Sequence, residues 1–241
     1  MSRKHQLRSQ RAGTIINATS KQQESDIIRA LTHVVDSLTR KFGASVALVH
    51  KRQWLLKDIV EELQFSYPEL ELHHHFHNTS IRPDGGILCL QPTRSSDVAL
   101  SYPVLIAEVK NQGTNDLRLT EGLAKQAKGN AIERLGKNLI GLRTALMRES
   151  IFPFVCFGYG CDFEPQSSIL DRVTTMAMFG RLNKTYLHNE ENGRICRGSF
   201  YFRPSRWSVD EMAEIMTDIA ERSVLYYFSK YSEAAFATGP S

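Results

Sequence analysis

The sequence predicts an α/β fold in which a central mixed β-sheet is flanked by helices on both sides. Short apolar runs typical of buried strands alternate with longer segments whose apolar residues keep helical spacing. At 241 residues, 41% of them hydrophobic, the chain is long enough for one domain with a sizeable core. We expect a flexible basic arm over residues 1–24, a single domain over residues 25–233 and a frayed tail over residues 234–241.

Composition narrows the possible functions. The apolar runs are too short to span a bilayer and the N-terminus carries no signal-peptide core, so we expect a cytoplasmic protein with no membrane partner. The four cysteines have neither zinc-ligand spacing nor the density of a disulfide framework, which favours reduced thiols. A net charge of +4 permits a nucleic-acid partner without requiring one.

The first third of the chain contains two amphipathic segments. Apolar spacing predicts a helix that begins at Ser25 or Asp26 and is stopped by Gly43. A second helix is expected from about Leu55 to Tyr67, because the residue before a proline avoids helical backbone angles.

A histidine-rich run follows the second helix. Residues 70–76 alternate between apolar and polar, which predicts a half-buried strand with His73, His75 and His77 on one face. A metal site is the alternative interpretation of these histidines. We favour a plain strand, because no structural-zinc spacing accompanies them.

Three charged residues lie on or beside two buried strands. Asp84 lies in a Pro-Asp-Gly-Gly turn before a strand over residues 87–90, and a second strand is expected over residues 104–110. Side chains on a strand repeat every two residues, so Glu108 and Lys110 face the same side. Charges at the end of a buried strand are costly unless they are paired or metal-bound.

These residues can support hydrolysis of a phosphodiester. Asp84, Glu108 and the backbone carbonyl of Val109 are hard oxygen donors that suit Mg²⁺. Lys110 could orient the attacking water and stabilise the pentacovalent phosphorus as a point charge. An Asp-x(n)-Glu-x-Lys pattern is common in proteins, however, so alone it indicates only a candidate site.

The second half of the chain mixes helices and strands. Its main helix is expected to begin near Asn130 and to turn an apolar stripe toward the core. The expected elements are a loop over 111–120, helix over 121–150 with a break at Gly129-Asn130, a strand over 152–157, a helix over 169–179, an Asn192-Gly193 hairpin between strands near Tyr186 and Tyr201, and a last helix opened by a Ser208–Glu211 capping box.

Three motifs give the chain a family resemblance. The stretches Ser80–Gly86, Ala107–Gly113 and Gly129–Arg134 resemble motifs of EcoRI-type restriction endonucleases, which belong to the PD-(D/E)XK nuclease superfamily. Lys137-Asn138 extends the third motif. The first two motifs alone indicate the superfamily, and the third is much more specific.

The resemblance implies a Type II restriction endonuclease of a prokaryotic cytoplasm. The enzyme would be a magnesium-dependent homodimer that cuts both strands of a palindromic double-stranded DNA site with an AATT core and leaves four-base 5′ overhangs. A cognate DNA methyltransferase would be its functional partner. The resemblance assigns Asp84 and Glu108 as metal ligands and Lys110 as the catalytic lysine.

The third motif implies major-groove contacts. Asn130 can bond adenine in a bidentate way, although a plain helix cap is the alternative role. Arg134 can donate to purine acceptors or brace Glu133. The residues expected to contact DNA are Arg82, Gln112, Lys128, Gly129, Asn130, Ala131, Glu133, Arg134 and Lys137.

The chain departs from the family pattern in three places. The family carries an arginine-bearing segment that helps to read an outer guanine, whereas Gly158–Ser168 contains no arginine, so the outer base pair is not predicted. Arg82 replaces a lysine, and the spacer between Asp84 and Glu108 is longer than expected. The alternatives are another PD-(D/E)XK DNA nuclease, with a repair or structure-selective role, and a non-catalytic DNA-binding protein.

Overall fold

The computed structural model describes residues 14–74, 77–93, 102–111, 113–125, 130–177, 181–191 and 193–237. Within these residues a five-stranded sheet has the order β1-β4-β5-β6-β7, and β2 pairs with β3 beside it. The strands are β1 (Leu48–Lys51), β2 (Trp54–Leu55), β3 (Ser80–Ile81), β4 (Gly86–Leu90), β5 (Pro103–Asn111), β6 (Phe154–Tyr159) and β7 (Ser199–Arg203). The α-helices are α2 (Thr14–Phe42), α3 (Leu56–Ser66), α4 (Gly113–Thr120), α5 (Asn130–Ala145), α6 (Ser168–Met176) and α7 (Val209–Tyr231).

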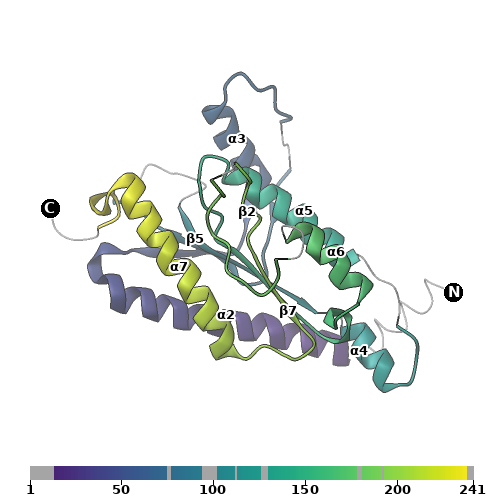
Figure 1. Cartoon of the computed structure of the whole chain (residues 1–241). Coiled ribbons are helices and arrows are strands. Elements are labelled where there is room, and N and C mark those ends of the chain that lie inside the picture. Colours follow the sequence, from purple (N-terminus) through teal and green to yellow (C-terminus); the bar gives the residue numbers. More distant parts are fainter. Residues whose placement is uncertain are drawn as a thin grey trace.

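Helices cover both faces of the sheet, so the predicted fold class is confirmed (Figure 1). The packed helices α2 and α7 cover one face, where Val109 and Phe157 point into their core. Helices α5 and α6 cover the other face, where Ile106 and Cys156 belong to a second core. Helix α3 projects from the body of the molecule (Figure 1). The two cores arise because successive side chains of a central strand point to opposite faces.

Strand β5 is the centre of the sheet. It runs antiparallel to β4, with Gly86 opposite Ala107, and parallel to β6, with Lys110 opposite Gly158. A parallel pair needs a crossover connection, and α4 and α5 lie in the one that joins β5 to β6. Helix α5 therefore returns from the edge of the sheet at which β5 ends.

Two helices follow the sequence prediction closely. The predicted stripe of α5 is buried, with every member 6% exposed or less. Ser208 and Glu211 form the predicted capping box at the start of α7. The stripe consists of Ile132, Leu135, Leu139 and Leu142 in α5 and of Leu146 just after its end.

The first helix begins earlier than predicted. Helix α2 starts at Thr14, so residues 14–24 are helical. Gly13 is followed by no glycine or proline before Gly43, so nothing in the backbone stops the helix. Residues 1–13 lie outside the described part, and the predicted division into arm, domain and tail stays a prediction.

The predicted strand after α3 is wrong where it can be compared. Residues 70–74 are irregular, and residues 75–76, which include His75, lie outside the described part. Leu70 is 43% exposed, so its apolar side chain is not buried in a core. The alternation of apolar and polar residues therefore does not mark a strand with one buried face here. His73, His74 and His77 are exposed.

Two predictions for the chain just after β5 are also wrong. The expected loop over 111–120 contains α4. The expected helix over 121–150 is instead a turn at Glu121-Gly122, an irregular stretch over 123–125 and then α5, which ends at Ala145. Helix α4 is held by a tertiary hydrogen bond, in which Nδ2 of buried Asn115 donates to Oδ2 of buried Asp162 at 2.6 Å.

The end of the chain contains two further differences. The expected hairpin strands near Tyr186 and Tyr201 do not pair, because β7 pairs in parallel with β6. A turn is nevertheless present, in which the Gly193 amide donates to the Glu190 carbonyl at 3.0 Å; Asn192 lies outside the described part. The predicted frayed tail is packed as far as Ala237, since Phe236 is fully buried.

Candidate active site

A tight turn brings the first predicted site residue to the central strand. The amide of Gly86 donates to the carbonyl of Pro83 at 3.0 Å, and the amide of Gly85 donates to Ala107 at 2.9 Å. Gly86 has a φ of +74°, and a Cβ there would overlap the ring of His50. The turn therefore requires glycine, as predicted, and it places Asp84 beside β5.

The structure brings Asp84, Glu108 and Lys110 together. The Asp84 amide donates to Oε2 of Glu108 at 2.9 Å, and the Val109 amide lies 3.3 Å from Oδ2 of Asp84. Nζ of Lys110 donates to the same Oδ2 at 3.3 Å and also to Oε1 of Glu108. One ammonium thus bridges two carboxylates, which are fixed to each other by backbone amides.

Burial and charge act in opposite directions on this cluster. Burial raises the pKa of the Glu108 carboxyl above its usual range, although the Lys110 ammonium partly opposes this effect. Burial alone would lower the pKa of Lys110, but Glu108 and Asp84 outweigh it and raise that pKa. The two carboxylates therefore favour the protonated form of Lys110.

The donor set fits a divalent cation. Asp84 and Glu108 supply carboxylate oxygens, the ligand type that hard cations prefer. Across the part of the chain that the structure describes, no group of three His, Cys, Asp or Glu side chains is placed to hold a metal. Backbone, water or substrate oxygens can complete the set around a cation, and the predicted role of the Val109 carbonyl stays a prediction.

An aromatic wall stands beside Lys110 and was not predicted from the sequence. Gly158 lies opposite Lys110, and a Cβ on Gly158 would overlap the ring of Phe202. Phe163 packs on Phe202 with ring centroids 4.7 Å apart. From the other face of the sheet, Nε1 of Trp207 donates to the Gly158 carbonyl at 3.1 Å.

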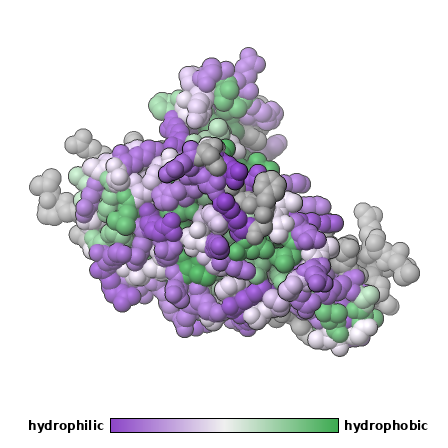
Figure 2. All heavy atoms as spheres, in the orientation of Figure 1, coloured by the Kyte–Doolittle hydropathy of each residue, from purple (hydrophilic) through white to green (hydrophobic). Residues whose placement is uncertain are grey.

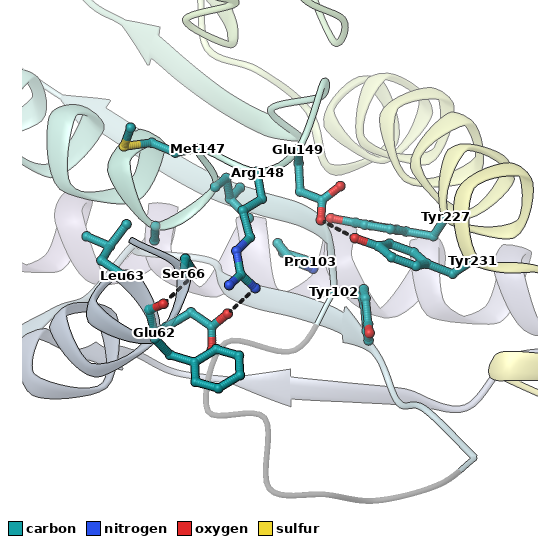
Figure 3. Close-up of a pocket in the computed structure, with 13 residues that line it drawn as sticks. Glu62, Leu63, Ser66, Tyr102, Pro103, Met147, Arg148, Glu149, Tyr227 and Tyr231 are labelled. Carbon is teal, nitrogen blue, oxygen red and sulfur yellow. Dashed lines mark hydrogen bonds and ion pairs between the residues drawn. The ribbon is translucent and has the colours of Figure 1, made fainter. Parts of the chain in front are cut away.

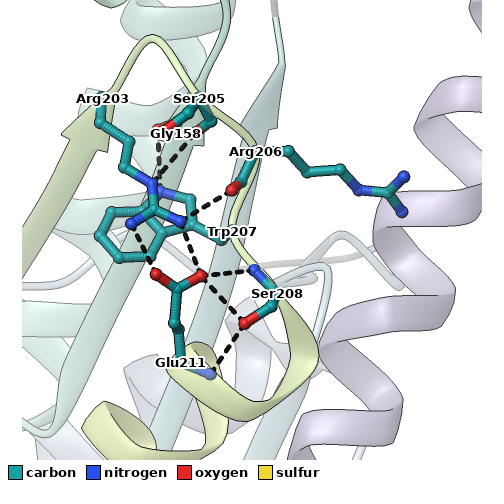
Figure 4. Close-up of polar contacts among 7 residues, drawn as sticks. All are labelled: Gly158, Arg203, Ser205, Arg206, Trp207, Ser208 and Glu211. Carbon is teal, nitrogen blue, oxygen red and sulfur yellow. Dashed lines mark hydrogen bonds and ion pairs between the residues drawn. The ribbon is translucent and has the colours of Figure 1, made fainter.

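Trp207 is itself clamped (Figure 4). The guanidinium of Arg203 lies 3.7 Å from the centre of its indole ring and donates to both carboxylate oxygens of Glu211, at 2.7 and 2.6 Å. Glu211 in turn accepts from the Ser208 amide at 2.8 Å. The capping box was the one signal in the sequence for this network, and it did not reveal the link to β6.

The predicted DNA-contacting residues fall into three groups. Arg82, Glu133, Arg134 and Lys137 are exposed. Asn130 and Ala131 open α5, as the third motif predicts. The predicted contacts Gln112, Lys128 and Gly129 lie outside the described residues.

The exposed charges of α5 lie on the Lys110 side of the sheet. The α5 core stripe packs on the face to which Cys156 belongs, and Cys156 lies opposite Glu108 in the parallel β5–β6 pair. Ile81, next to Arg82, packs beside Gly141 of the same helix. The first motif and the helix that the third motif opens therefore pack on the same face of the sheet as Glu108 and Lys110.

The surface is polar over the face drawn in Figure 2, where hydrophobic residues form only small patches. Within the described ranges, no helix combines the length and apolar character needed to cross a membrane.

Comparison with known proteins assigns the family. A sequence model described as restriction endonuclease EcoRI matches residues 9–234. This chain belongs to the EcoRI restriction endonuclease family. It is 32% identical over 207 residues to the Type II restriction enzyme RsrI of Cereibacter sphaeroides. This match covers 70% of this chain and 72% of the relative. It is 30% identical over 203 residues to the Type II restriction enzyme EcoRI of Escherichia coli. This match covers 69% of this chain and 72% of the relative.

Family membership confirms the resemblance seen in the three motifs. The chain is a Type II restriction endonuclease, which is a site-specific deoxyribonuclease. Type II restriction enzymes act on double-stranded DNA and are usually homodimers, and the family implies a divalent metal requirement.

Proposed function

We propose that this enzyme uses Mg²⁺ to hydrolyse both strands of a palindromic DNA site with an AATT core, leaving 5′ overhangs. Asp84, Glu108 and Lys110 are the proposed catalytic residues, and the carbonyl of Val109 is a proposed further metal ligand. The observation that carries the assignment is the bridge from Nζ of Lys110 to both carboxylates. Such a set of two acids and one fixed cation suits phosphodiester hydrolysis.

Each side chain has a separate task. A bound divalent cation would lower the pKa of a water and neutralise charge on the phosphate. Asp84 and Glu108 would hold that cation through their carboxylate oxygens. Lys110 orients the attacking water and balances charge on the phosphoryl oxygens.

The water oxygen forms a bond to phosphorus while the bond from phosphorus to O3′ breaks. The water releases a proton to solvent, and O3′ leaves with the electron pair and takes up a proton. The products are a 5′-phosphate and a 3′-hydroxyl, and Lys110 stabilises the pentacovalent state between them.

Sequence recognition is proposed to come from the start of α5. Asn130 can make bidentate bonds to adenine, and Arg134 can donate to purine acceptors in the major groove. The exposure of Glu133, Arg134 and Lys137 supports this role. We propose that two copies of the chain bind one palindrome, because the two-fold symmetry of the protein then matches that of the site. A methyltransferase that modifies the same site is the proposed functional partner.

Substitution of the lysine tests the catalytic assignment. Lys110→Ala should lose cleavage by several orders of magnitude while specific DNA binding stays measurable in calcium buffer, because the ammonium acts on the reaction more than on binding. Lys41→Ala is the matched control, since Lys41 pairs with Glu221 on the α2–α7 face. Cleavage by Lys110→Ala at the rate of the control would overturn the assignment.

Sequencing of fragment ends tests the target. Plasmid DNA cut in the presence of magnesium should give discrete fragments whose ends carry AATT overhangs. Random ends or nicks would favour the repair or structure-selective nuclease instead. No cutting under any divalent metal would favour a non-catalytic DNA-binding protein.

A further inference from the structure

The two ends of β5 differ in what supports them. At its start, Pro103 lines a pocket of about 240 Å³, where the guanidinium of Arg148 is directed at the carboxylate of Glu62 and donates to it at 2.7 Å (Figure 3). Neighbouring side chains thus pair their charges there. Near the other end of the strand, Glu108 depends on a turn outside the strand, the one that carries Asp84.

The turn that carries Asp84 is held from two sides. On one side, the Asp84 amide donates to Oε2 of Glu108 at 2.9 Å and the Gly85 amide donates to the Ala107 carbonyl at 2.9 Å. On the other side, Nε2 of His50, a residue of β1, lies 3.0 Å from the carbonyl oxygen of Gly85. A carbonyl can only accept a hydrogen bond, so the imidazole is the donor.

The pairing of β1 with β4 sets the position of this imidazole. His50 lies opposite Leu88 in the antiparallel pair, and β4 begins two residues earlier, at Gly86. The ring reaches this diagonal neighbour, because a Cβ on Gly86 would overlap Nε2 of His50. Only a glycine lets the ring approach the turn this closely.

His50 lies on the face of the sheet opposite to the catalytic side chains. Cross-strand partners share a face, and Leu88 belongs to the core under α2 and α7. Ala107 and Val109 belong to that same core, so Glu108, which lies between them on β5, points to the other face. His50 therefore supports the turn from behind.

The peptide between Gly85 and Gly86 is the part of the turn that needs this support. Two consecutive glycines have the least restricted backbone of any residue pair. The amide of this peptide donates to Pro83 at 3.0 Å within the turn, and its carbonyl accepts from His50. A water in place of the imidazole would satisfy the carbonyl without tying it to β1.

We propose that His50 is a positioning residue for Asp84. By holding the Gly85 carbonyl, it keeps the Asp84 carboxylate at the place where Nζ of Lys110 meets it. Loss of a group that orients a metal ligand costs roughly 10–100-fold in metal affinity or activity. The inference rests on the proposed role of Asp84 as a metal ligand. What His50 supplies is an N–H group, so a glutamine, whose Nε2 has a similar reach, should replace it.

Nuclear magnetic resonance tests the hydrogen bond in the full chain, without metal or DNA. Gly85-Gly86 is the one Gly-Gly pair in the sequence, so glycine labelled at its carbonyl carbon and amide nitrogen gives a single carbonyl–amide correlation, which comes from this peptide. His50→Phe keeps a ring but loses the donor, so the carbonyl signal should move to lower frequency. His50→Gln should keep it close to the wild-type position. An unchanged carbonyl signal in His50→Phe would overturn the proposal.

Cleavage across a magnesium series tests the consequence for the reaction. His50→Phe should raise the magnesium concentration that gives half-maximal cleavage by about tenfold, and His50→Gln should restore most of this loss. A merely structural role for the ring would change the amount of folded enzyme and not this concentration. His33→Phe is the matched control, because His33 is an exposed histidine of α2 that lies 3.8 Å from exposed Asp210. The control should behave as the wild type does in both experiments.

Two further variants keep the outcomes distinct. If His50→Phe does not fold, His50→Asn replaces it, because the shorter side chain cannot reach the Gly85 carbonyl and should give the same two changes. Asp84→Asn should abolish cleavage, and cutting at the wild-type rate would instead refute the proposed function. If Asp84→Asn is inactive while His50→Phe keeps the wild-type magnesium requirement, the positioning role of His50 alone is refuted.

Discussion

The indole nitrogen of Trp207 lies 3.1 Å from the carbonyl oxygen of Gly158, the residue opposite Lys110 in the β5–β6 pair. The loop before α7 is thereby tied to the strand beside the proposed catalytic lysine. The tie matters because a reacting group displaced by a fraction of an ångström loses much of its effect.

Loss of this hydrogen bond should lower stability and activity together. Trp207→Phe keeps an aromatic ring but leaves the Gly158 carbonyl without its donor, which should cost about 1–3 kcal/mol in the free energy of unfolding. Trp54→Phe is the control, because buried Nε1 of Trp54 has no partner among the described residues. Urea unfolding should show the larger loss for Trp207→Phe, and equal losses would contradict a role for the hydrogen bond.

Substitution by alanine should lower the stability of the fold at Gly158 and raise it at Gly136. Gly158→Ala places a methyl group in the ring of Phe202, so we expect a loss of about 1–3 kcal/mol in stability and a lower cleavage rate. Gly136→Ala lies inside α5 and meets only the flexible sulfur of Met176 at 3.3 Å, so a gain of about 0.5–1 kcal/mol is expected. Thermal unfolding of both variants checks the signs, and a stable Gly158→Ala variant would refute the close packing of Phe202.

The hydrogen bonds that Glu211 accepts should make the stability of the fold depend on pH. Hydrogen bonds from Arg203 and from Ser208 lower the pKa of Glu211 from 4.5 to about 2. Because its folded-state pKa is depressed, its contribution is present above about pH 4.5 and is lost as pH falls toward 2. The urea midpoints of wild type and Glu211→Gln should therefore differ most at neutral pH and converge in acid.

Asp218→Asn supplies the comparison for this pH series. Asp218 pairs with Arg222 at 3.3 Å on the exposed side of the same helix, and exposed pairs of this kind contribute little. Its urea midpoint should stay close to that of the wild type throughout. If the difference in urea midpoint between wild type and Glu211→Gln persists unchanged in acid, the Glu211 carboxylate is not stabilised by Arg203 and Ser208.

The acid limb of the cleavage rate should report on Glu108. Burial favours the neutral carboxyl and raises its pKa above the usual 4.5, and a protonated Glu108 cannot hold a cation. Activity should therefore fall, as pH is lowered, with a midpoint above 4.5. Infrared difference spectra of wild type against Glu108→Gln would locate the carboxyl band directly.

Lys110→Met gives this experiment a second arm. It removes the ammonium that lowers the Glu108 pKa, so the carboxyl band should titrate at higher pH than in the wild type. A band that titrates at or below the ordinary value in both proteins would contradict the assignment of Glu108 as a buried acid.

Features with a local cause were predictable from the sequence. The stripe of α5, the capping box of α7 and the shared face of Glu108 and Lys110 depend on periodicity or on residues three positions apart. The approach of Asp84 to them followed from a turn that needs Gly86. The folded structure keeps these local features because tertiary packing does not oppose them.

Features with a long-range cause were not predictable. Helix α4 depends on a hydrogen bond from Asn115 to Asp162, and the packed tail depends on the Thr93 amide, which donates to Ala235 at 2.8 Å. Each bond joins segments far apart in the sequence. Phe202 likewise lies beside Gly158 and Lys110 because β7 pairs in parallel with β6. The turn at Gly193 had instead suggested that this strand pairs with a segment near Tyr186 in an antiparallel hairpin.

The bridge from Lys110 to Asp84 and Glu108 gives the protein an internal counter-ion. Two neighbouring acids that repel each other would otherwise destabilise the chain when no metal is bound. Here a tethered ammonium already neutralises much of that repulsion. Assembly of the fold and loading of the ion can thus be separate events in the life of the enzyme, so a chelator would silence it without unfolding it.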